Sequence, residues 1–381
     1  MSSPVSVRVD WGCAAGGAFF TMKKAVILLI CAGVFLLDVA CNRSTELRLE
    51  TLRGTTMGTT YMVKWVVSET GSRDRQPLPE TLRKGVKRVL DDINWKMSTY
   101  IPDSEISRFN QYTGTDWFPI SEDLYVVLRE ALRISEISAG AFDVTVGPLV
   151  NLWGFGVEGR RDEIPSEESI RDTLERVGAA SLDVRSQPPA VRKKNPSTSC
   201  DLAAIAKGYG VDRVAEWIES QGVVRYLVEI GGELRGRGLN HLDGPWRVGI
   251  ATPSEGVGIQ TVIPLLDQAM ATSGDYRNYY EKDGIRYSHT IDPRTGRPVA
   301  HGLASITVIA ETCTEADAMA TALHVLGPER GREMAERQGI AAFFIVRREG
   351  RFIEIPTPAF RVILGSRMPA RQDDDTGMRE R

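Results

Sequence analysis

The sequence has few cysteines for its length of 381 residues, and they are scattered. Three of the five fall within the first 41 residues, and the other two are Cys200 and Cys313. Neither a Cys-x-x-Cys pair nor a Cys/His cluster occurs, which excludes a disulfide-stapled scaffold and gives no sign of a zinc site. The spacing leaves open whether Cys200 and Cys313 form a disulfide.

An excess of basic residues is also missing, because 47 Lys and Arg stand against 50 Asp and Glu and give a formal net charge of −3. Without a broad electropositive surface, nucleic acid is not an expected partner. A phosphate-bearing ligand would instead be held by a few local groups or by a metal ion. The chain is 42% apolar and 25% charged, which is typical of a soluble globular protein with a substantial core.

An apolar run long enough to cross a membrane is not found at the N-terminus, where residues 25–37 give 13 of the ~20 residues needed. The run follows two lysines and ends at Ala40-Cys41, a pattern typical of the signal peptide of an exported lipoprotein. One departure is Asp38, at a position that is usually apolar. We therefore expect export to the periplasmic side of a bacterial cell envelope and a lipid anchor at Cys41. A plain cleaved signal and an uncleaved anchor are the alternatives.

The leader and signal peptide are expected to occupy residues 1–40, with the translation start at the first methionine or at Met22. Residues 41–367 are expected to form the functional domain, in one lobe or two, with a charged and proline-bearing insertion or linker near 157–196. Residues 368–381 are charged and lack apolar periodicity, which predicts a disordered tail.

Apolar residues recur every three or four positions across 79–98 and 121–138, which predicts two amphipathic helices. Residues 46–65 alternate and are rich in Thr, with Met, Tyr61 and Val63 in the second half, which predicts two strands around a turn. A further helix is predicted over 201–217, and mostly short strands follow it. Because strands and helices do not alternate regularly, we predict an α+β fold with mainly antiparallel sheets and packed helices, not a doubly wound parallel sheet.

The glycine-rich residues 231–238 do not form a dinucleotide-binding fingerprint. That motif requires a strand, then Gly-x-Gly-x-x-Gly, then a helix, whereas here strand residues follow the glycines. We predict that these glycines form the turn of a hairpin.

A Thr-x-x-Glu capping box at Thr312 and Glu315 predicts that a helix begins there. Asp317 and Thr321 then lie one turn apart on the same helix face, and their oxygens are hard ligands of the kind that Mg²⁺ prefers. Spacing alone favours a structural interpretation, in which Asp317 stabilises the positive end of the helix.

Residues 201–212 begin with an acid that can cap a helix, and Lys207 follows in the first turns. A helix N-terminus with a lysine beside it can hold a phosphate or a ribose hydroxyl, although a surface lysine is the more frequent case. His289 ends a strand beside the turn at Asp292-Pro293. It can activate a hydroxyl as a general base, or it can be structural.

Eight ordered stretches, which together cover about residues 47–364, resemble the ApbE family of FAD:protein FMN transferases. They are TMGTTY (56–61), MSTY with DSEISRFN (97–110), GAFDVTVGPL (140–149), DLAAIAKGYGVD (201–212), EIGGE (229–233), ATSGDY (271–276), YSHTIDPRTGRP (287–298) and EADAMATALHVLG (315–327). The eight motifs in this order are far more specific than any one of them. The resemblance implies an ApbE-like architecture related to the T-fold.

The resemblance also implies roles for individual residues. The residues at positions that contact FAD are Met57, Tyr100, Ala141, Phe142, Asp143, Asp201, Lys207 and Ile291. The residues at positions that hold Mg²⁺ are Ala204, through its carbonyl, Asp317, Ala320 and Thr321. His289 matches a histidine near the reacting phosphate and is the expected catalytic base. The resemblance therefore favours Mg²⁺ binding by Asp317 and Thr321 over the structural interpretation.

The activity implied by the resemblance is Mg²⁺-dependent transfer of FMN from FAD to a threonine or serine hydroxyl of a partner protein, with release of AMP. The implied acceptors are flavin-bearing subunits of membrane or exported redox complexes. Two alternatives use the same ligand: an FAD pyrophosphatase with water as the acceptor, and a lipoprotein that binds FAD without catalysis. A structural envelope lipoprotein is a third alternative.

Overall fold

The computed structural model describes residues 47–68, 79–159, 163–253, 258–275 and 279–365. The expected signal peptide and C-terminal tail lie outside these residues.

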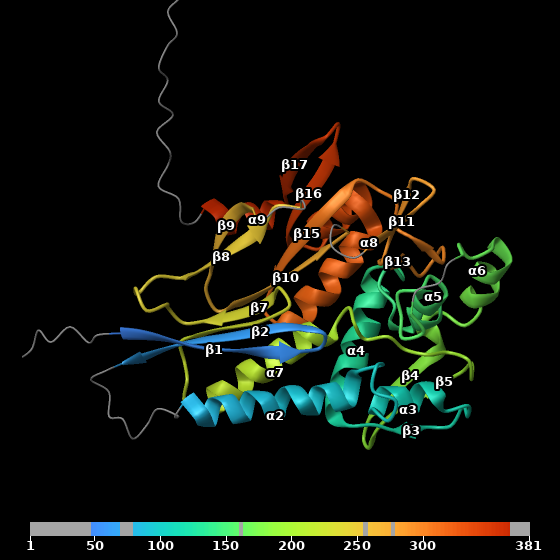
Figure 1. Cartoon of the computed structure of the whole chain (residues 1–381), viewed down its shortest axis with the longest axis horizontal. Helices are drawn as coiled ribbons and strands as arrows, with labels where there is room; N and C mark the ends of the chain where they lie inside the picture. Colours follow the sequence, from blue (N-terminus) through green and yellow to red (C-terminus); the bar gives the residue numbers. More distant parts are fainter. Residues whose placement is uncertain (1–46, 69–78, 160–162, 254–257, 276–278, 366–381) are drawn as a thin grey trace, which may run out of the picture. The chain divides into compact units, whose positions relative to one another are not determined.

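A mainly antiparallel sheet organises the described residues (Figure 1). Its strands, in spatial order, are β1 (Leu47–Thr56), β2 (Thr59–Ser68), β6 (Tyr226–Ile230), β7 (Glu233–Arg237), β10 (Gln268–Gly274), β15 (Leu303–Ala310), β16 (Ala341–Arg348) and β17 (Arg351–Pro356). Each neighbouring pair from β2 to β17 is antiparallel. The predicted α+β class and its antiparallel sheet are therefore confirmed.

Both faces of this sheet are buried, because successive side chains of a strand point to opposite sides. In β16, Phe344 and Val346 join the core on one face, while Phe343 and Ile345 join the core on the other. The first six residues of β16, 341–346, are therefore all apolar.

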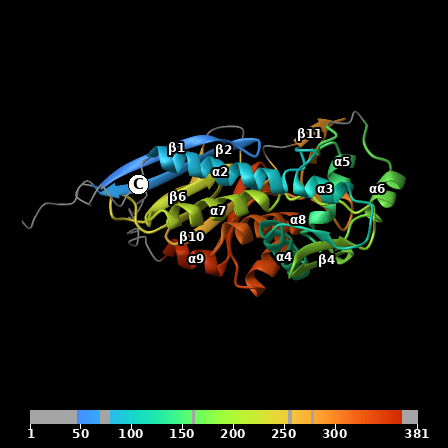
Figure 2. The same cartoon turned by 90° about the horizontal axis from the view of Figure 1, so that it is seen from below.

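Helices α2 (Pro79–Met97), α7 (Ala206–Ser220) and α8 (Cys313–Arg337) cover one face of the sheet. Figure 2 shows α2 and α7 side by side along it. On the opposite face, the core includes side chains from the hairpin β8 (Trp246–Ala251) and β9 (Ile259–Leu265) and from α9 (Pro358–Gly365). Four of the residues that the sequence assigns to a site lie on these helices, namely Lys207 on α7 and Asp317, Ala320 and Thr321 on α8.

The remaining elements flank this layer. Helices α3 (Glu105–Gln111) and α4 (Glu122–Ile137) follow α2, and short helices η2 (Val144–Val146), α5 (Gly147–Leu152), α6 (Glu167–Leu174) and η3 (Ala179–Ser181) come next. A small sheet has the order β3 (Phe118–Pro119), β5 (Pro189–Lys193), β4 (Leu182–Ser186). Two short pairs are β11 (Tyr279–Lys282) with β12 (Ile285–Ser288) and β13 (Ile291–Asp292) with β14 (Arg297–Pro298). The charged segment near 157–196 therefore contains a helix and a hairpin.

Local signals in the sequence fix the ends of several elements. Thr312 caps α8, and its side chain accepts a hydrogen bond from the backbone N–H of Glu315, as the capping box predicts. Helix α8 is interrupted at Gly327, which has a φ of 78°.

In the described part of the chain, no helix is long and apolar enough to cross a membrane.

Candidate active site

Helices α7 and α8 touch where Gly208 faces the start of α8. A Cβ atom on Gly208 would lie 2.3 Å from the carbonyl oxygen of Cys313 and 2.8 Å from the Cβ of Asp317, so only glycine permits this approach. The backbone N–H of Gly208 donates to Oδ2 of Asp317 over 2.9 Å. Close contact thus brings the two sequence motifs that contain Lys207 and Asp317 together.

Lys207 lies between two buried carboxylates at this contact. Its Nζ is 2.9 Å from Oε1 of Glu233 and 3.7 Å from Oδ1 of Asp317. The Lys207 side chain keeps 28% of its surface exposed, against 6% for Glu233 and 4% for Asp317. Lys207 is therefore the member of this group whose side chain is most exposed.

The charges of this group affect one another. Burial raises the pKa of Glu233 to about 7, although the ammonium of Lys207 acts in the opposite direction. Burial alone would lower the pKa of Lys207, but the charges of Asp317 and Glu233 raise it above its ordinary value, so the ammonium stays charged. Oε2 of Glu233 is buried and makes no hydrogen bond to the part of the chain that the structure describes.

Three of the predicted magnesium ligands, Asp317, Thr321 and the carbonyl of Ala204, offer oxygens to a cation, whereas the side chain of Ala320 is a methyl group without a donor atom. Asp317 and Thr321 lie one turn apart on α8, with Ala320 buried beside Thr321, and Ala204 lies in the turn before α7. Oδ1 of Asp317 is beyond hydrogen-bond distance of Lys207, and the hydroxyl of Thr321 lies 3.1 Å from that of Ser273 on β10. Mg²⁺ is often bound through one or two carboxylates together with substrate phosphates. Among the described residues, no three His, Cys, Asp or Glu side chains form a metal-binding group.

Met57 is held close to α7 by a turn in which it adopts a positive φ. It has a φ of 48° and Gly58 has a φ of 71°, so the two residues between β1 and β2 form a tight hairpin turn of the kind with positive φ at both positions. A non-glycine residue adopts this conformation at a cost of order 1 kcal/mol or more. Cε of Met57 lies 3.1 Å from where a Cβ on Gly210 would be, so a glycine in α7 makes room for it.

Asp201 and Asp143 come from neighbouring segments. The backbone N–H of Asp201 donates to the carbonyl of Val144 over 2.7 Å. The carboxylate of Asp143 accepts from the backbone and hydroxyl of Thr145 and from the N–H of Ala179. Burial raises the pKa of both carboxyl groups. Asp143 therefore has a structural function in its own loop, and Ala141 and Phe142 before it are buried.

A cavity of about 190 Å³ opens beside Asp201. Its lining residues are Thr99, Ser107, Asn110, Gln111, Gly147, Asn151, Val157, Ser199, Cys200 and Asp201. Ligand pockets of drug-sized molecules are typically ~300–1,000 Å³, so this one has room for part of a dinucleotide. Tyr100 follows the lining residue Thr99 and is 71% exposed, which leaves its ring free to cover a bound molecule.

Ile291 and His289 belong to a different packing unit from Lys207. Ile291 is buried among Leu149, Trp153 and Ile170, so its backbone is what it can offer to a ligand. The ring of His289 lies edge-on to that of Phe155, with centroids 6.4 Å apart. Burial, His301 and then His289 lower the pKa of His324, on α8, to about 3.

Asp201 does not cap the helix that follows: α7 begins at Ala206, and the carboxylate of Asp201 accepts from the N–H of Ala203 within the preceding turn. Cys200 and Cys313 are both free, buried thiols, and burial raises the pKa of each.

The sequence-based assignments also missed residues that the structure brings to this region. Glu233, Ser273 and Asn110 lie within the quoted motifs but had no assigned role. Their positions depend on contacts between distant segments, which no local spacing encodes.

Residues 57–344 match the ApbE family. A protein named FAD:protein FMN transferase from Vibrio cholerae is 43% identical over 337 residues, which are 88% of this chain and 98% of the relative. Another of that name from Haemophilus influenzae is 42% identical over 345 residues, covering 89% and 98%. A solved structure titled flavin transferase ApbE from Vibrio cholerae superposes with a TM-score of 0.77 at 43% identity, covering 83% of this chain and 99% of that one. The Pseudomonas stutzeri flavinyl transferase ApbE gives a TM-score of 0.77 at 40% identity, covering 84% and 98%.

A fold and sequence shared to this extent with transferases make the chain an enzyme of the transferase class. It belongs to the ApbE family.

Proposed function

We propose that this protein transfers FMN from FAD to a threonine or serine hydroxyl of a partner protein and releases AMP. The observation that carries the proposal is the group of Lys207, Asp317 and Thr321 at the contact between α7 and α8, in a chain whose relatives are named FAD:protein FMN transferases. In the reaction, the acceptor oxygen forms a bond to the phosphorus on the FMN side. The pyrophosphate P–O bond breaks, and AMP leaves with the electron pair.

Charge neutralisation and positioning are the main demands of such a transfer. Mg²⁺ would be held by Asp317, Thr321 and the carbonyl of Ala204, with Ala320 packed beside Thr321, and would supply positive charge to the pyrophosphate. Two carboxyl groups, those of Glu233 and Asp317, surround the single ammonium of Lys207, and such an arrangement favours a cation at this place. Lys207 adds a positive charge beside the two carboxylates.

The remaining predicted residues are proposed to bind FAD and to remove the proton of the acceptor hydroxyl. Met57 and Tyr100, with the segment Ala141–Asp143 and the residues Asp201 and Ile291, are proposed to contact FAD. The acceptor hydroxyl must lose its proton as the new bond forms, and we assign its removal to the ring of His289.

The experiment that tests this function combines the full chain, FAD, Mg²⁺ and a protein substrate of the Vibrio cholerae relative. Covalent flavin is read as fluorescence of the acceptor band on a denaturing gel. A fluorescent band that requires both FAD and Mg²⁺ supports transfer. FMN and AMP without a labelled band indicate a pyrophosphatase, and intact FAD indicates a binding protein without catalysis; either result overturns the proposal.

We further propose that the protein is exported, anchored by a lipid at Cys41 on the periplasmic side of the envelope, and that its acceptors are flavin-bearing subunits of membrane or exported redox complexes. The basis is the apolar run of residues 25–37 and the Ala40-Cys41 pair that follows it. Mass spectrometry of the mature N-terminus tests the anchor. An acylated Cys41 supports it, an unacylated mature N-terminus contradicts acylation alone, and an intact, unprocessed N-terminus contradicts export.

A further inference from the structure

Helix α7 has no cap of its own. Its N-cap residue, Ile205, carries an aliphatic side chain that cannot accept a hydrogen bond from the first turn. The carboxylate of Asp317, which comes from α8, accepts from the third N–H of α7, that of Gly208, over 2.9 Å. A residue from the neighbouring helix thus acts as the cap.

Helix α8 is capped in return by α7. The carboxylate of Asp212 accepts from the backbone N–H of Cys313 over 3.0 Å, from that of Thr314 over 2.8 Å and from the Thr314 hydroxyl over 2.6 Å. Arg235 of β7 donates to the same carboxylate over 2.9 Å. Asp212 is only 4% exposed, and its acceptor capacity is used by these four contacts.

The two caps form a repeated contact along the crossing of the helices. Gly208 and Asp212 lie one turn apart on α7, and their counterparts, Asp317 and the Cys313-Thr314 pair, lie one turn apart on α8. The two helices are hydrogen-bonded at two places one turn apart, so rotation or sliding of α8 would break both contacts. The position of Asp317 is therefore tied to the carboxylate of Asp212.

We propose that Asp212 is a positioning residue that holds Asp317 in place for the metal and substrate, an inference that rests on the proposed function for its catalytic consequence. Asp212 acts through the first turn of α8 and does not itself touch the ligand. Groups that orient a metal ligand typically contribute about 10- to 100-fold to metal affinity.

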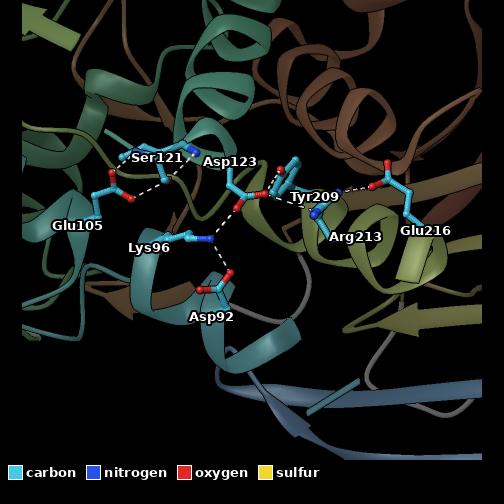
Figure 3. A network of polar contacts seen from close by, with 9 residues as sticks. Asp92, Lys96, Glu105, Ser121, Asp123, Tyr209, Arg213 and Glu216 are labelled. Carbon is cyan, nitrogen blue, oxygen red and sulfur yellow. Dashed lines mark hydrogen bonds and ion pairs between the residues drawn. The ribbon is translucent and has the colours of Figure 1, made fainter. Parts of the chain in front are cut away.

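The adjacent face of α7 offers a matched control. Tyr209 and Arg213, each one residue further along than Gly208 and Asp212, bind Asp123 of α4 over 2.5 Å and 3.3 Å (Figure 3). Lys96 of α2 lies 2.6 Å from the other oxygen of Asp123. The contacts of Asp123 among the described residues therefore link α4 to α7 and α2, and none of them involves α8.

The test compares Asp212→Asn and Asp123→Asn with the wild-type full chain. Amide hydrogen exchange, followed by mass spectrometry over residues 206–210, reports the bond from Gly208 to Asp317. Mn²⁺ titration in the presence of FAD, followed by the signal of free Mn²⁺ in electron paramagnetic resonance, reports the metal. We expect Asp212→Asn to accelerate exchange of the Gly208 amide and to weaken Mn²⁺ binding by about tenfold or more. Asp123→Asn removes a partner of Tyr209 in the same segment, and we expect it to change exchange of the Gly208 amide and Mn²⁺ binding much less than Asp212→Asn does.

Wild-type exchange and Mn²⁺ affinity in Asp212→Asn would overturn the proposal, as would equal effects of the two variants, because these would show a general loosening of α7. If Asp212→Asn does not fold, Thr314→Val removes one of the four contacts and is expected to shift both measurements in the same direction by a smaller factor. Wild-type amide exchange and Mn²⁺ affinity in Thr314→Val would then contradict the proposal. A wild-type chain that transfers no FMN would contradict the proposed function alone, since hydrogen exchange still decides the link between Asp212 and Asp317.

Discussion

Asn110 and Cys200 hold each other through two hydrogen bonds although they are 90 residues apart in the sequence. The side-chain amide of Asn110 donates to the carbonyl of Cys200 over 2.8 Å, and the N–H of Cys200 donates to the side-chain oxygen over 2.7 Å. Both residues line the cavity, and Asp201 is the next residue along. The pair therefore fixes the backbone at one wall of the proposed FAD site.

Buried Lys193 supports this wall from behind. Its ammonium donates to the carbonyls of Phe109, Asn110 and Thr198 over 3.3, 3.1 and 3.0 Å, and burial lowers its pKa. Lys193→Met would leave three carbonyls without this donor, so we expect the free energy of unfolding to fall by about 2–4 kcal/mol and FAD to bind more weakly. Urea denaturation and quenching of FAD fluorescence measure the two effects.

The neighbouring Lys194→Met is the control for this prediction. Lys194 is exposed and donates to the carbonyl of Ala180 at the surface. We expect it to change the free energy of unfolding by no more than about 0.5 kcal/mol. Equal effects of the two substitutions would show that the buried ammonium has no special function.

Two substitutions of Asp317 separate its metal-binding and capping functions. Asp317→Asn retains an acceptor for the Gly208 N–H, whereas Asp317→Ala removes it and should cost about 1 kcal/mol more in stability, the usual value of a helix cap. Both should abolish FMN transfer, because neither supplies a carboxylate to Mg²⁺. Rates over a Mg²⁺ titration and urea denaturation test this. Transfer by Asp317→Asn at the wild-type rate with an unchanged Mg²⁺ requirement would show that the metal is held elsewhere.

Substitution of His289 tests its assignment as the base. General-base assistance typically contributes about 10²–10⁴ in rate, so His289→Asn should slow transfer by that factor with little change in FAD affinity. The wild-type rate should rise through about pH 6–7, the usual range of an imidazole, and this rise should vanish in the variant. A parallel loss of FAD affinity with an unchanged pH profile would make His289 a binding or packing residue.

Acid stability should depend on His324, which is fully buried in α8 with its ring edge-on to His301. Burial, followed by the charge of His301, lowers its pKa from 6.5 to about 3. Between these values the unfolded chain binds a proton that the folded chain does not, so the free energy of unfolding falls as the pH drops below about 6.5. At pH 5 this loss amounts to about 2 kcal/mol for one such group.

His324→Leu should remove that loss, because the variant has no titrating ring at this position. Urea denaturation at pH 7.5 and pH 5 provides the comparison between wild type and variant. We expect the variant to lose about 2 kcal/mol less than the wild type over this interval. The same loss in both proteins would mean that other groups control acid stability.

The sequence predicted the elements whose signals are local. The apolar spacing of 79–98 and 121–138 predicts α2 and α4, and the Thr312 capping box fixes the start of α8. The start of α7 was wrong by several residues because its cap comes from Asp317, which lies more than a hundred positions away. A cap supplied by another helix leaves no trace at the helix N-terminus itself.

In the charged segment near 157–196, a core residue likewise depends on contacts with distant segments that leave no local signal. Its composition favoured an insertion or linker, yet β5 pairs with both β3 and β4 and carries the buried Lys193. A lysine that donates to three backbone carbonyls has no carboxylate partner for which a sequence pattern could be searched. Such a residue becomes recognisable only when the segments that surround it are known.

The most direct measurement of the central claim is the intact mass of the acceptor after reaction with this chain, FAD and Mg²⁺. We predict an added mass equal to FMN less one water, one AMP released for each flavin attached, and no addition when the flavin-carrying hydroxyl residue of the acceptor is replaced by alanine. Asp317→Asn should give an unmodified acceptor under the same conditions. An acceptor of unchanged mass beside wild-type enzyme that has consumed its FAD, or an equal addition with Asp317→Asn, would contradict the account.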